Sequence, residues 1–177
     1  MSLIENVARM PDWPTDTFKT TLPDDFTTGP TSIWFDANVG GDGGAIGYML
    51  VRFRDAVTYA AGQPVMFDDA DLGSVTNDIS GAFIASKAPF AGVCLGVPTQ
   101  NQYGWIQISG FVTNSVTHTD IAAGDWLVVN IADARFDNTT TTLALVDHDV
   151  CAYALEGHDS GATDIIIIPS QLLRAYI

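Results

Sequence analysis

Short apolar runs separated by polar turns make up most of this chain, and two of these runs flank one turn. Val93, Leu95 and Val97 alternate with other residues, and after the turn PTQNQYG a second run extends from Trp105 to Ile108. Alternation with a period of two is typical of a β-strand that buries one face. The two runs therefore predict a β-hairpin, and its long loop leaves the register open.

This arrangement occurs twice along the chain. Ala61-Gly62 and Ala123-Gly124 each begin a unit in which an apolar run precedes a polar interval and a strand–turn–strand pair. The two copies lie about 60 residues apart, within the range of periods that repeats show. We therefore predict a duplicated strand–hairpin unit, with copies at 61–110 and 123–169. The alternative is that strand, turn and strand recur in any all-β chain.

The remaining apolar runs are equally short, and almost none has the periodicity of a helix. Further strands are predicted at 32–36, 47–54, 56–60, 111–117 and 143–146. The chain is therefore predicted to be all-β, with one β-domain over residues 32–177. Its 177 residues are enough for one such domain with an arm.

Residues 1–31 differ from the rest of the chain. Four prolines in this segment, at positions 11, 14, 23 and 30, prevent a continuous helix. Large apolar side chains also occur in it, whereas a disordered tail usually lacks aromatic residues. We therefore predict an extended N-terminal arm that packs these side chains on its own domain, on a neighbouring subunit or on a larger scaffold. The predicted partner-binding residues of the arm are Trp13, Phe18, Leu22 and Phe26.

The charge balance limits the choice of partners. The chain has 21 acidic and 7 basic residues and a net charge of −14. Nucleic acids and anionic membranes are expected to be repelled, because their affinity for proteins comes chiefly from lysine and arginine. No apolar stretch is long enough to span a membrane, and the opening MSLIENVARMP has no apolar signal region. We expect synthesis in the cytoplasm without export, and neither nucleic acid nor membrane as a partner.

Two of the few basic residues, Arg52 and Arg54, lie two positions apart in a predicted strand. Side chains at this spacing share one face of a strand, and Phe53 points to the other face. These arginines are predicted either to form ion pairs with the acidic surface or to contact a partner. A solvated strand face is the alternative.

No residue pattern indicates catalysis, a cofactor or a metal site, and we predict that the protein is not an enzyme. The histidines have no metal-binding spacing. A partial calcium-loop pattern begins at Asp36, but Gly47 stands where the liganding glutamate belongs. The aspartates lie in loops rich in glycine, serine and asparagine, as turn residues do. Cys94 and Cys151 fall in apolar runs of the two copies and are predicted to be buried free thiols.

Four short motifs resemble those of the small capsid cement, or head decoration, proteins of tailed bacteriophages. They are "G-V-x-L-G-V" at Gly92 to Val97, "W-I-Q-I-S-G" at Trp105 to Gly110, the Ala-Gly-Asp turn at Ala123 to Asp125, and "A-x-A-L-E-G" at Ala152 to Gly157. The resemblance covers about residues 56–170. The N-terminal arm departs from the compact pattern of that family, which leaves its role open.

The resemblance implies a compact antiparallel β-barrel or β-tulip-like domain that forms oligomers, usually trimers, on the exterior of a phage head. The implied function is to clamp subunits of the major capsid protein after head expansion, so the implied partners are that protein and further copies of this chain. Many symmetric copies of a modest interface stabilise a shell through multivalency. The protein would be made in the host cytoplasm and located in the virion.

Two other classes of function remain open. An arm followed by an all-β domain also fits another virion part, such as a head fibre base, a tail tube or a tail-associated β-module. A carbohydrate-binding module or small hydrolase is the third class, because Tyr103, Trp105 and Trp126 are residue types that stack on sugar rings. Their positions inside strand patterns favour packing in the core instead.

Overall fold

Ten β-strands form the part of the chain that the computed structural model describes, and these described residues contain no helix. The described residues are 18–21, 33–36, 46–54, 58–68, 71–77, 90–118, 120–130, 134–138, 150–157 and 161–168. The predicted strand at 143–146 lies outside these ranges.

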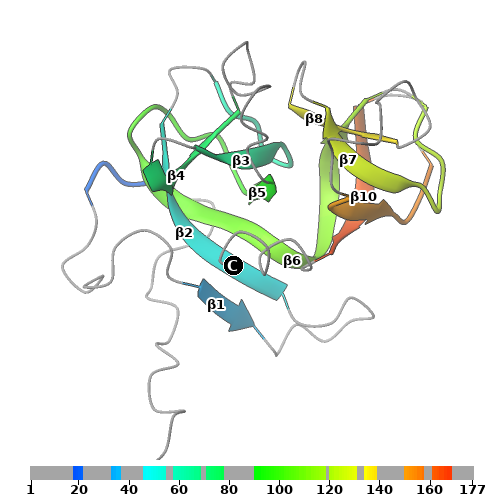
Figure 1. Cartoon of the computed structure of the whole chain (residues 1–177), viewed down its shortest axis with the longest axis horizontal. Helices are drawn as coiled ribbons and strands as arrows, with labels where there is room; N and C mark the ends of the chain where they lie inside the picture. The colour runs from blue at the N-terminus through cyan, green and yellow to red at the C-terminus, as the bar shows by residue number, and fades with distance from the viewer. Residues whose placement is uncertain are drawn as a thin grey trace, which may run out of the picture.

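The strands form two barrel-like rings that share one long strand, β6 (Figure 1). The first ring consists of β2 (Ile46–Phe53), β3 (Pro64–Asp68), β4 (Asp71–Thr76), β5 (Phe90–Cys94) and the first half of β6 (Tyr103–Thr117). The second ring consists of the second half of β6, β7 (Trp126–Asn130), β8 (Arg135–Asn138), β9 (Ala152–Ala154) and β10 (Gly161–Ile167). β1 (Ile33–Asp36) pairs with the edge of β2.

The two rings repeat the same order of pairing. In the first ring β2 pairs with β4 and β6, and β3 pairs with β4 and β5. In the second ring β6 pairs with β8 and β10, and β7 pairs with β8 and β9. Each ring therefore includes a strand that precedes the predicted repeat at 61 or 123.

One joint in each ring is parallel, and the other pairings of the described strands are antiparallel. The β2–β4 joint is parallel over two residue pairs, Arg52↔Ser74 and Phe53↔Val75. The β6–β8 joint is parallel at the single pair Thr117↔Phe136. Because these joints are so short, each ring is barrel-like without a continuous closing ladder. The predicted all-β fold is confirmed.

β6 joins the rings by bending between its two halves (Figure 1). Its first half pairs with β2 and β5, and its second half pairs with β10. Gly110 lies between the halves with a φ of 86°, a conformation that only glycine adopts readily. A bend at this position allows one strand to belong to two rings that face different directions.

The predicted hairpin is confirmed, because β5 and β6 are paired at Val93↔Gln107 and Cys94↔Ile106. The β5 strand ends at Cys94, earlier than the alternating pattern indicates, and Val97 is 60% exposed in the loop that follows. The predicted strand at 56–60 is not formed in its described part, residues 58–60. There the buried Tyr59 donates its hydroxyl to Val75 O, which fixes this segment as a loop against the core.

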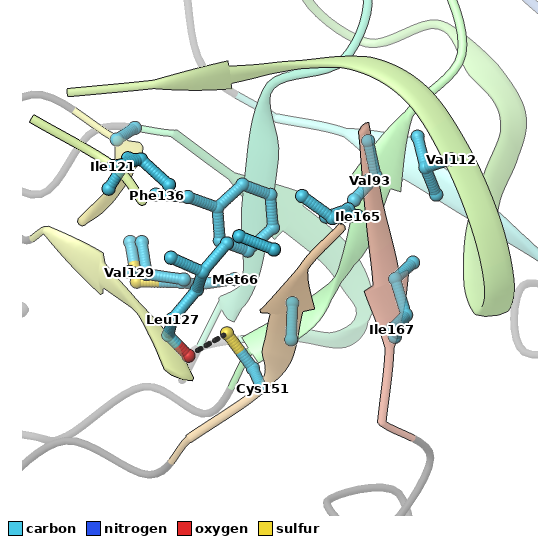
Figure 2. Packing of buried hydrophobic residues seen from close by; sticks show 13 residues of the cluster. Met66, Val93, Val112, Ile121, Leu127, Val129, Phe136, Cys151, Ile165 and Ile167 are labelled. Atoms are coloured by element: carbon cyan, nitrogen blue, oxygen red, sulfur yellow. Dashed lines mark hydrogen bonds between the residues drawn. The ribbon is translucent and has the colours of Figure 1, made fainter. Parts of the chain in front are cut away.

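Two clusters of buried side chains fill the rings. The interior of the first ring contains Val51, Phe53, Phe67, Val75 and Ile106 among others. The second cluster contains the interior of the second ring together with Met66 and Val93, which point outward from the first ring (Figure 2). Burial of the Met66 and Val93 side chains favours close packing of the two rings, since buried apolar area is the main source of stability.

Both cysteines are buried free thiols, as predicted. Cys94 is in β5, whereas Cys151 immediately precedes β9 and its Sγ lies 3.5 Å from Leu127 O (Figure 2). The two residues are in corresponding parts of the two rings but not at equivalent positions. The residue equivalent to Cys94 is Ala154, because each exchanges backbone hydrogen bonds with the Ala-Gly turn of its own ring.

Candidate functional site

The two Ala-Gly turns have the same hydrogen bonds, which identifies them as equivalent features of the two rings. Gly62 N donates to Cys94 O at 2.8 Å, and Cys94 N donates to Gln63 O at 2.9 Å. In the second ring Gly124 N donates to Ala154 O, and Ala154 N donates to Asp125 O, both at 2.9 Å. Gly62 and Gly124 have φ angles of 78° and 94°. The turns therefore need glycine at this position.

An asparagine anchors each turn in the same way. Asn77 Nδ2 donates to Gln63 Oε1 at 3.0 Å and lies 3.4 Å from Thr58 O. Asn138 Nδ2 lies 3.4 Å from Asp125 Oδ2 and donates to Asp120 O at 3.0 Å.

The side chain inside each turn also accepts a hydrogen bond from the backbone. Gln63 Oε1 accepts from Ala60 N at 3.0 Å, and Asp125 Oδ2 accepts from Ala122 N at 2.8 Å. Asp125 is thus a structural turn residue, in agreement with the turn chemistry expected of the aspartates.

The two turns differ in what covers them. A Cβ at Gly62 would lie 2.4 Å from Asn114 O, and Gly62 O accepts a hydrogen bond from Val116 N at 2.9 Å. The first turn is therefore docked on the second half of β6. A Cβ at Gly124 would meet only Tyr153 Oη, at 3.4 Å. The second turn is therefore open to solvent, whereas the first turn is part of the junction between the rings.

A row of large apolar side chains lies on the outer face of the second ring, beside this open turn. We call it the outer row, and its members are cross-strand neighbours on four adjacent strands: Trp126, Tyr153, Ile166 and Phe111. Trp126 is 53% exposed, and the other three are half-buried. The rings of Trp126 and Tyr153 are 5.3 Å apart at 69° to one another.

The corresponding row of the first ring is buried. The pair Pro64↔Val93 corresponds to Trp126↔Tyr153, and Val93↔Gln107 corresponds to Tyr153↔Ile166. Pro64, Val93 and Gln107 are all buried. Sequence patterning did not identify the outer row, because the same alternation occurs where these outer positions are buried, in the first ring, and where they are partly exposed, in the second.

The structure describes one of the four predicted partner-binding residues of the arm. Phe18 is half-buried and lies edge-on to Phe53, with ring centroids 5.5 Å apart, over Gly104. The adjacent Lys19 exchanges two backbone hydrogen bonds with Tyr103, of 2.9 and 2.6 Å. Of the alternatives for the arm, packing on its own domain therefore holds for this part. Trp13, Leu22 and Phe26 lie outside the described residues.

Arg52 and Arg54 have polar partners within the chain. Arg52 Nη2 donates to Asn101 Oδ1 at 2.7 Å, and Arg54 Nη1 lies 2.9 Å from Asp68 Oδ2. The Arg54 side chain is 46% exposed and that of Asp68 is 6% exposed. A pair this open to water contributes about 1 kcal/mol or less. The ion-pair alternative therefore holds for Arg54, and contact with a partner stays a prediction for both arginines.

The candidate nucleophiles and metal ligands among the described residues are thiol, imidazole and carboxylate side chains. Burial raises the pKa of the Cys94 thiol to about 12, an effect that exceeds the opposing influence of hydrogen bonds with the Gly96 and Leu95 backbone. A neutral thiol of this kind is a poor nucleophile at physiological pH. No three His, Cys, Asp or Glu side chains are placed to hold a metal ion in the described ranges, which exclude His148 and His158.

A cleft of about 390 Å³ lies where the docked turn meets β6. Its lining includes Gly62, Leu95, Gln107, Phe111 and Thr113, and none of its lining side chains has a charge at neutral pH. The amide of Gln107 lies in this region, where its Nε2 donates hydrogen bonds to Ser109 O and Phe111 O, at 3.1 and 2.7 Å.

Within the described residues there is no helix of the length and apolar character that a membrane span requires.

Comparisons with known proteins identify no family for this chain. No protein-family model matches it, and no curated protein matches it. Among solved structures, the head fibre gp8.5 N base of bacteriophage phi29 is similar over 70% of this chain and 97% of that chain, with a TM-score of 0.43 and 14% sequence identity. A similarity at this level establishes neither the fold nor the function of the present chain.

Proposed function

We propose that this protein is a structural component of a tailed-phage virion that binds the outer surface of the head and clamps subunits of the major capsid protein. The supporting observation is that the Ala-Gly turn, one of the motifs that resemble those of cement proteins, has the same architectural role in both rings. Ala61-Gly62 and Ala123-Gly124 begin the equivalent strands β3 and β7, and each is bonded to the strand that follows the polar interval.

The physical properties of the chain suit this role. Adhesion to a shell needs a rigid body, and most contacts here join strands that are distant in sequence. The net charge of −14 disfavours binding to the packaged nucleic acid and favours a partner surface with basic residues. Many copies of a modest interface on a symmetric shell act together through multivalency. A trimeric form is part of this proposal.

Electron microscopy of the virion that contains this protein tests the proposal. We expect its density on the head exterior, where subunits of the major capsid protein meet. Density in the tail would contradict the proposal and favour a tail-tube or tail-associated module, and density restricted to a projecting fibre would favour a head fibre base. Purified full-length protein should also bind expanded heads that lack it and raise the temperature at which those heads release DNA.

A truncation separates the role of the arm from that of the domain. Because Phe18 and Lys19 pack on the first ring, the truncation should remove residues 1–16 and retain these two. We expect the truncated protein to keep the circular dichroism spectrum of the full chain and to bind heads more weakly. Unchanged binding by the truncated protein would show that residues 1–16 do not contact the head.

A further inference from the structure

A carboxylate lies beside the outer row of the second ring. Asp164 is on β10, two positions before Ile166, so the two side chains are on the same face of the sheet. Leu155 N donates to Asp164 O at 2.9 Å, which places Asp164 diagonally across from Tyr153, the partner of Ile166. Diagonal neighbours of this kind are about 7–8 Å apart, so one long side chain can reach both. Asp164 thus adds a negative charge to the edge of an aromatic surface.

A bulge in β6 holds this carboxylate in place. β6 has one extra residue between its pairings with Thr163 and Ile165. Asn114 lies in the bulge with a φ of 54°, and its backbone N donates to Asp164 Oδ1 at 3.0 Å. No described residue donates a hydrogen bond to the other oxygen, Oδ2, and the side chain is half-buried. This oxygen is therefore available to a donor from another molecule.

The aromatic part of the surface has an accessible indole. Trp126 is 53% exposed and pairs with Tyr153, which lies between it and Asp164. Indole binds cations more strongly than the other aromatic side chains do, because the face of its π system is negative. A cationic side chain on Trp126 would therefore be attracted both by the ring and by the nearby carboxylate.

The charge of the two rings differs in the same sense. The described residues of the second ring, within 111–168, contain five acidic side chains and one basic side chain: Asp120, Asp125, Asp137, Glu156 and Asp164 against Arg135. The described residues of the first ring, within 46–110, contain two of each: Asp68 and Asp71 against Arg52 and Arg54. The ring that carries the outer row is thus the more acidic one. Its potential favours a basic partner and disfavours an acidic one, including a second copy with its charge of −14.

We propose that this face binds an arginine side chain on the surface of a partner protein. The guanidinium stacks on Trp126 and donates to Asp164 Oδ2, while its apolar stem covers Tyr153. Arginine suits the face better than lysine, because a planar guanidinium stacks on aromatic rings and loses less hydration on leaving water. A neutral sugar could stack on Trp126 as well, but it would gain nothing from the surrounding negative charge.

Nuclear magnetic resonance titration of the full chain tests this inference. The probe is a short peptide with blocked ends and one arginine between glycines, and its control is the same peptide with neutral citrulline in place of arginine. We expect the arginine peptide to shift the indole N–H signal of Trp126, identified by its loss in Trp126→Leu. The arginine peptide should bind at least about 5-fold more tightly than the citrulline peptide. This preference should shrink as the salt concentration rises, since salt screens exposed charges.

Two variants separate the parts of the site. Trp126→Leu keeps an apolar side chain but removes the π system, and Asp164→Asn keeps an oxygen for Asn114 N but removes the charge. Each should weaken binding of the arginine peptide about 3–5-fold and leave binding of the citrulline peptide unchanged. Asp120→Asn is the matched control, because it removes one negative charge from the same ring at an exposed position outside the row, and it should bind as the wild type does.

The possible results decide the inference in either direction. Equal binding of the arginine and citrulline peptides would overturn it, and so would a Trp126 signal that only neutral oligosaccharides shift. Wild-type affinity of either Asp164→Asn or Trp126→Leu, with circular dichroism showing a folded protein, would also overturn it.

The inference rests on the proposed function only in taking the partner to be the major capsid protein. A protein that binds phage heads but whose Trp126 signal ignores the arginine peptide would support the capsid role and refute the arginine site. Arginine binding that depends on Trp126 and Asp164, in a protein that does not bind heads, would support the site and refute the capsid role.

Discussion

Replacement of Gly62 by alanine should destabilise the fold more than replacement of Gly124, although the two glycines occupy equivalent turns. Both residues have positive φ angles, 78° and 94°. A residue with a Cβ is strained there by about 1–2 kcal/mol. Part of that cost is offset, by about 0.4–1 kcal/mol, because alanine restricts the unfolded chain. The backbone term alone therefore predicts a loss of about 1 kcal/mol for either substitution.

Only Gly62 meets a second obstacle. Its new Cβ would lie 2.4 Å from Asn114 O and 3.1 Å from Ser115 Cα, both backbone atoms of β6 that cannot rotate away. Separation of the turn from β6 would cost about 1–3 kcal/mol in strain. It would also weaken the hydrogen bond from Val116 N to Gly62 O, a net loss of about 1 kcal/mol. We therefore expect a total loss of about 3–5 kcal/mol for Gly62→Ala.

Urea unfolding of both variants measures this difference. With a slope of about 2 kcal/mol per molar urea, the midpoint should fall by about 0.5 M for Gly124→Ala and about 1.5–2.5 M for Gly62→Ala. Gly161→Ala is a third variant, with a φ of 102° and no atom within 4 Å of its Cβ, and it should behave like Gly124→Ala. Equal losses at Gly62 and Gly124 would refute the idea that the first turn is docked tightly against β6.

Three further outcomes can be measured on the purified chain. Cys94 should not react with a thiol reagent at neutral pH until the protein is unfolded, because burial raises its pKa from 9.0 to about 12. The contribution of this thiol to the free energy of unfolding is therefore complete below pH 9 and is lost between pH 9 and about 12. Urea titrations of Cys94→Ala should lack this pH dependence. Asn138→Ala should lower the free energy of unfolding by about 1–3 kcal/mol, because the side chain that anchors the second turn is removed. Asn77→Ala should have the same effect through the first turn. A loss below about 0.5 kcal/mol, the usual effect of a surface substitution, would contradict the anchoring role. Phe18→Ala should cost about 1–3 kcal/mol by exposing Phe53, whereas a thermal melt identical to that of the wild type would mean that the arm contact contributes nothing.

The local features of this fold follow from local patterns in the chain. Alternation with a period of two predicted the β5–β6 hairpin, since a strand with a buried face needs an apolar side chain at every second position. The Ala-Gly pairs predicted turns, because glycine tolerates the positive φ that both turns contain. The apolar surroundings of Cys94 and Cys151 predicted buried thiols, and both are buried.

Pairings between distant strands could not be predicted in this way. The parallel joints β2–β4 and β6–β8 connect strands that are not consecutive, and no local pattern specifies such a joint. The sharing of β6 between two rings depends on a bend at Gly110, and the sequence offers several other glycines in similar surroundings.

The sequence by itself thus determined the class of secondary structure and the turns, and it predicted the duplication of a strand–hairpin pattern. Only the tertiary structure decided which faces of the two rings are covered: Val93 is buried against the second ring, whereas its counterpart Tyr153, in the outer row, is half-buried. The physical reason is that strand periodicity reports that two faces alternate, while burial of either face depends on which other part of the molecule packs against it.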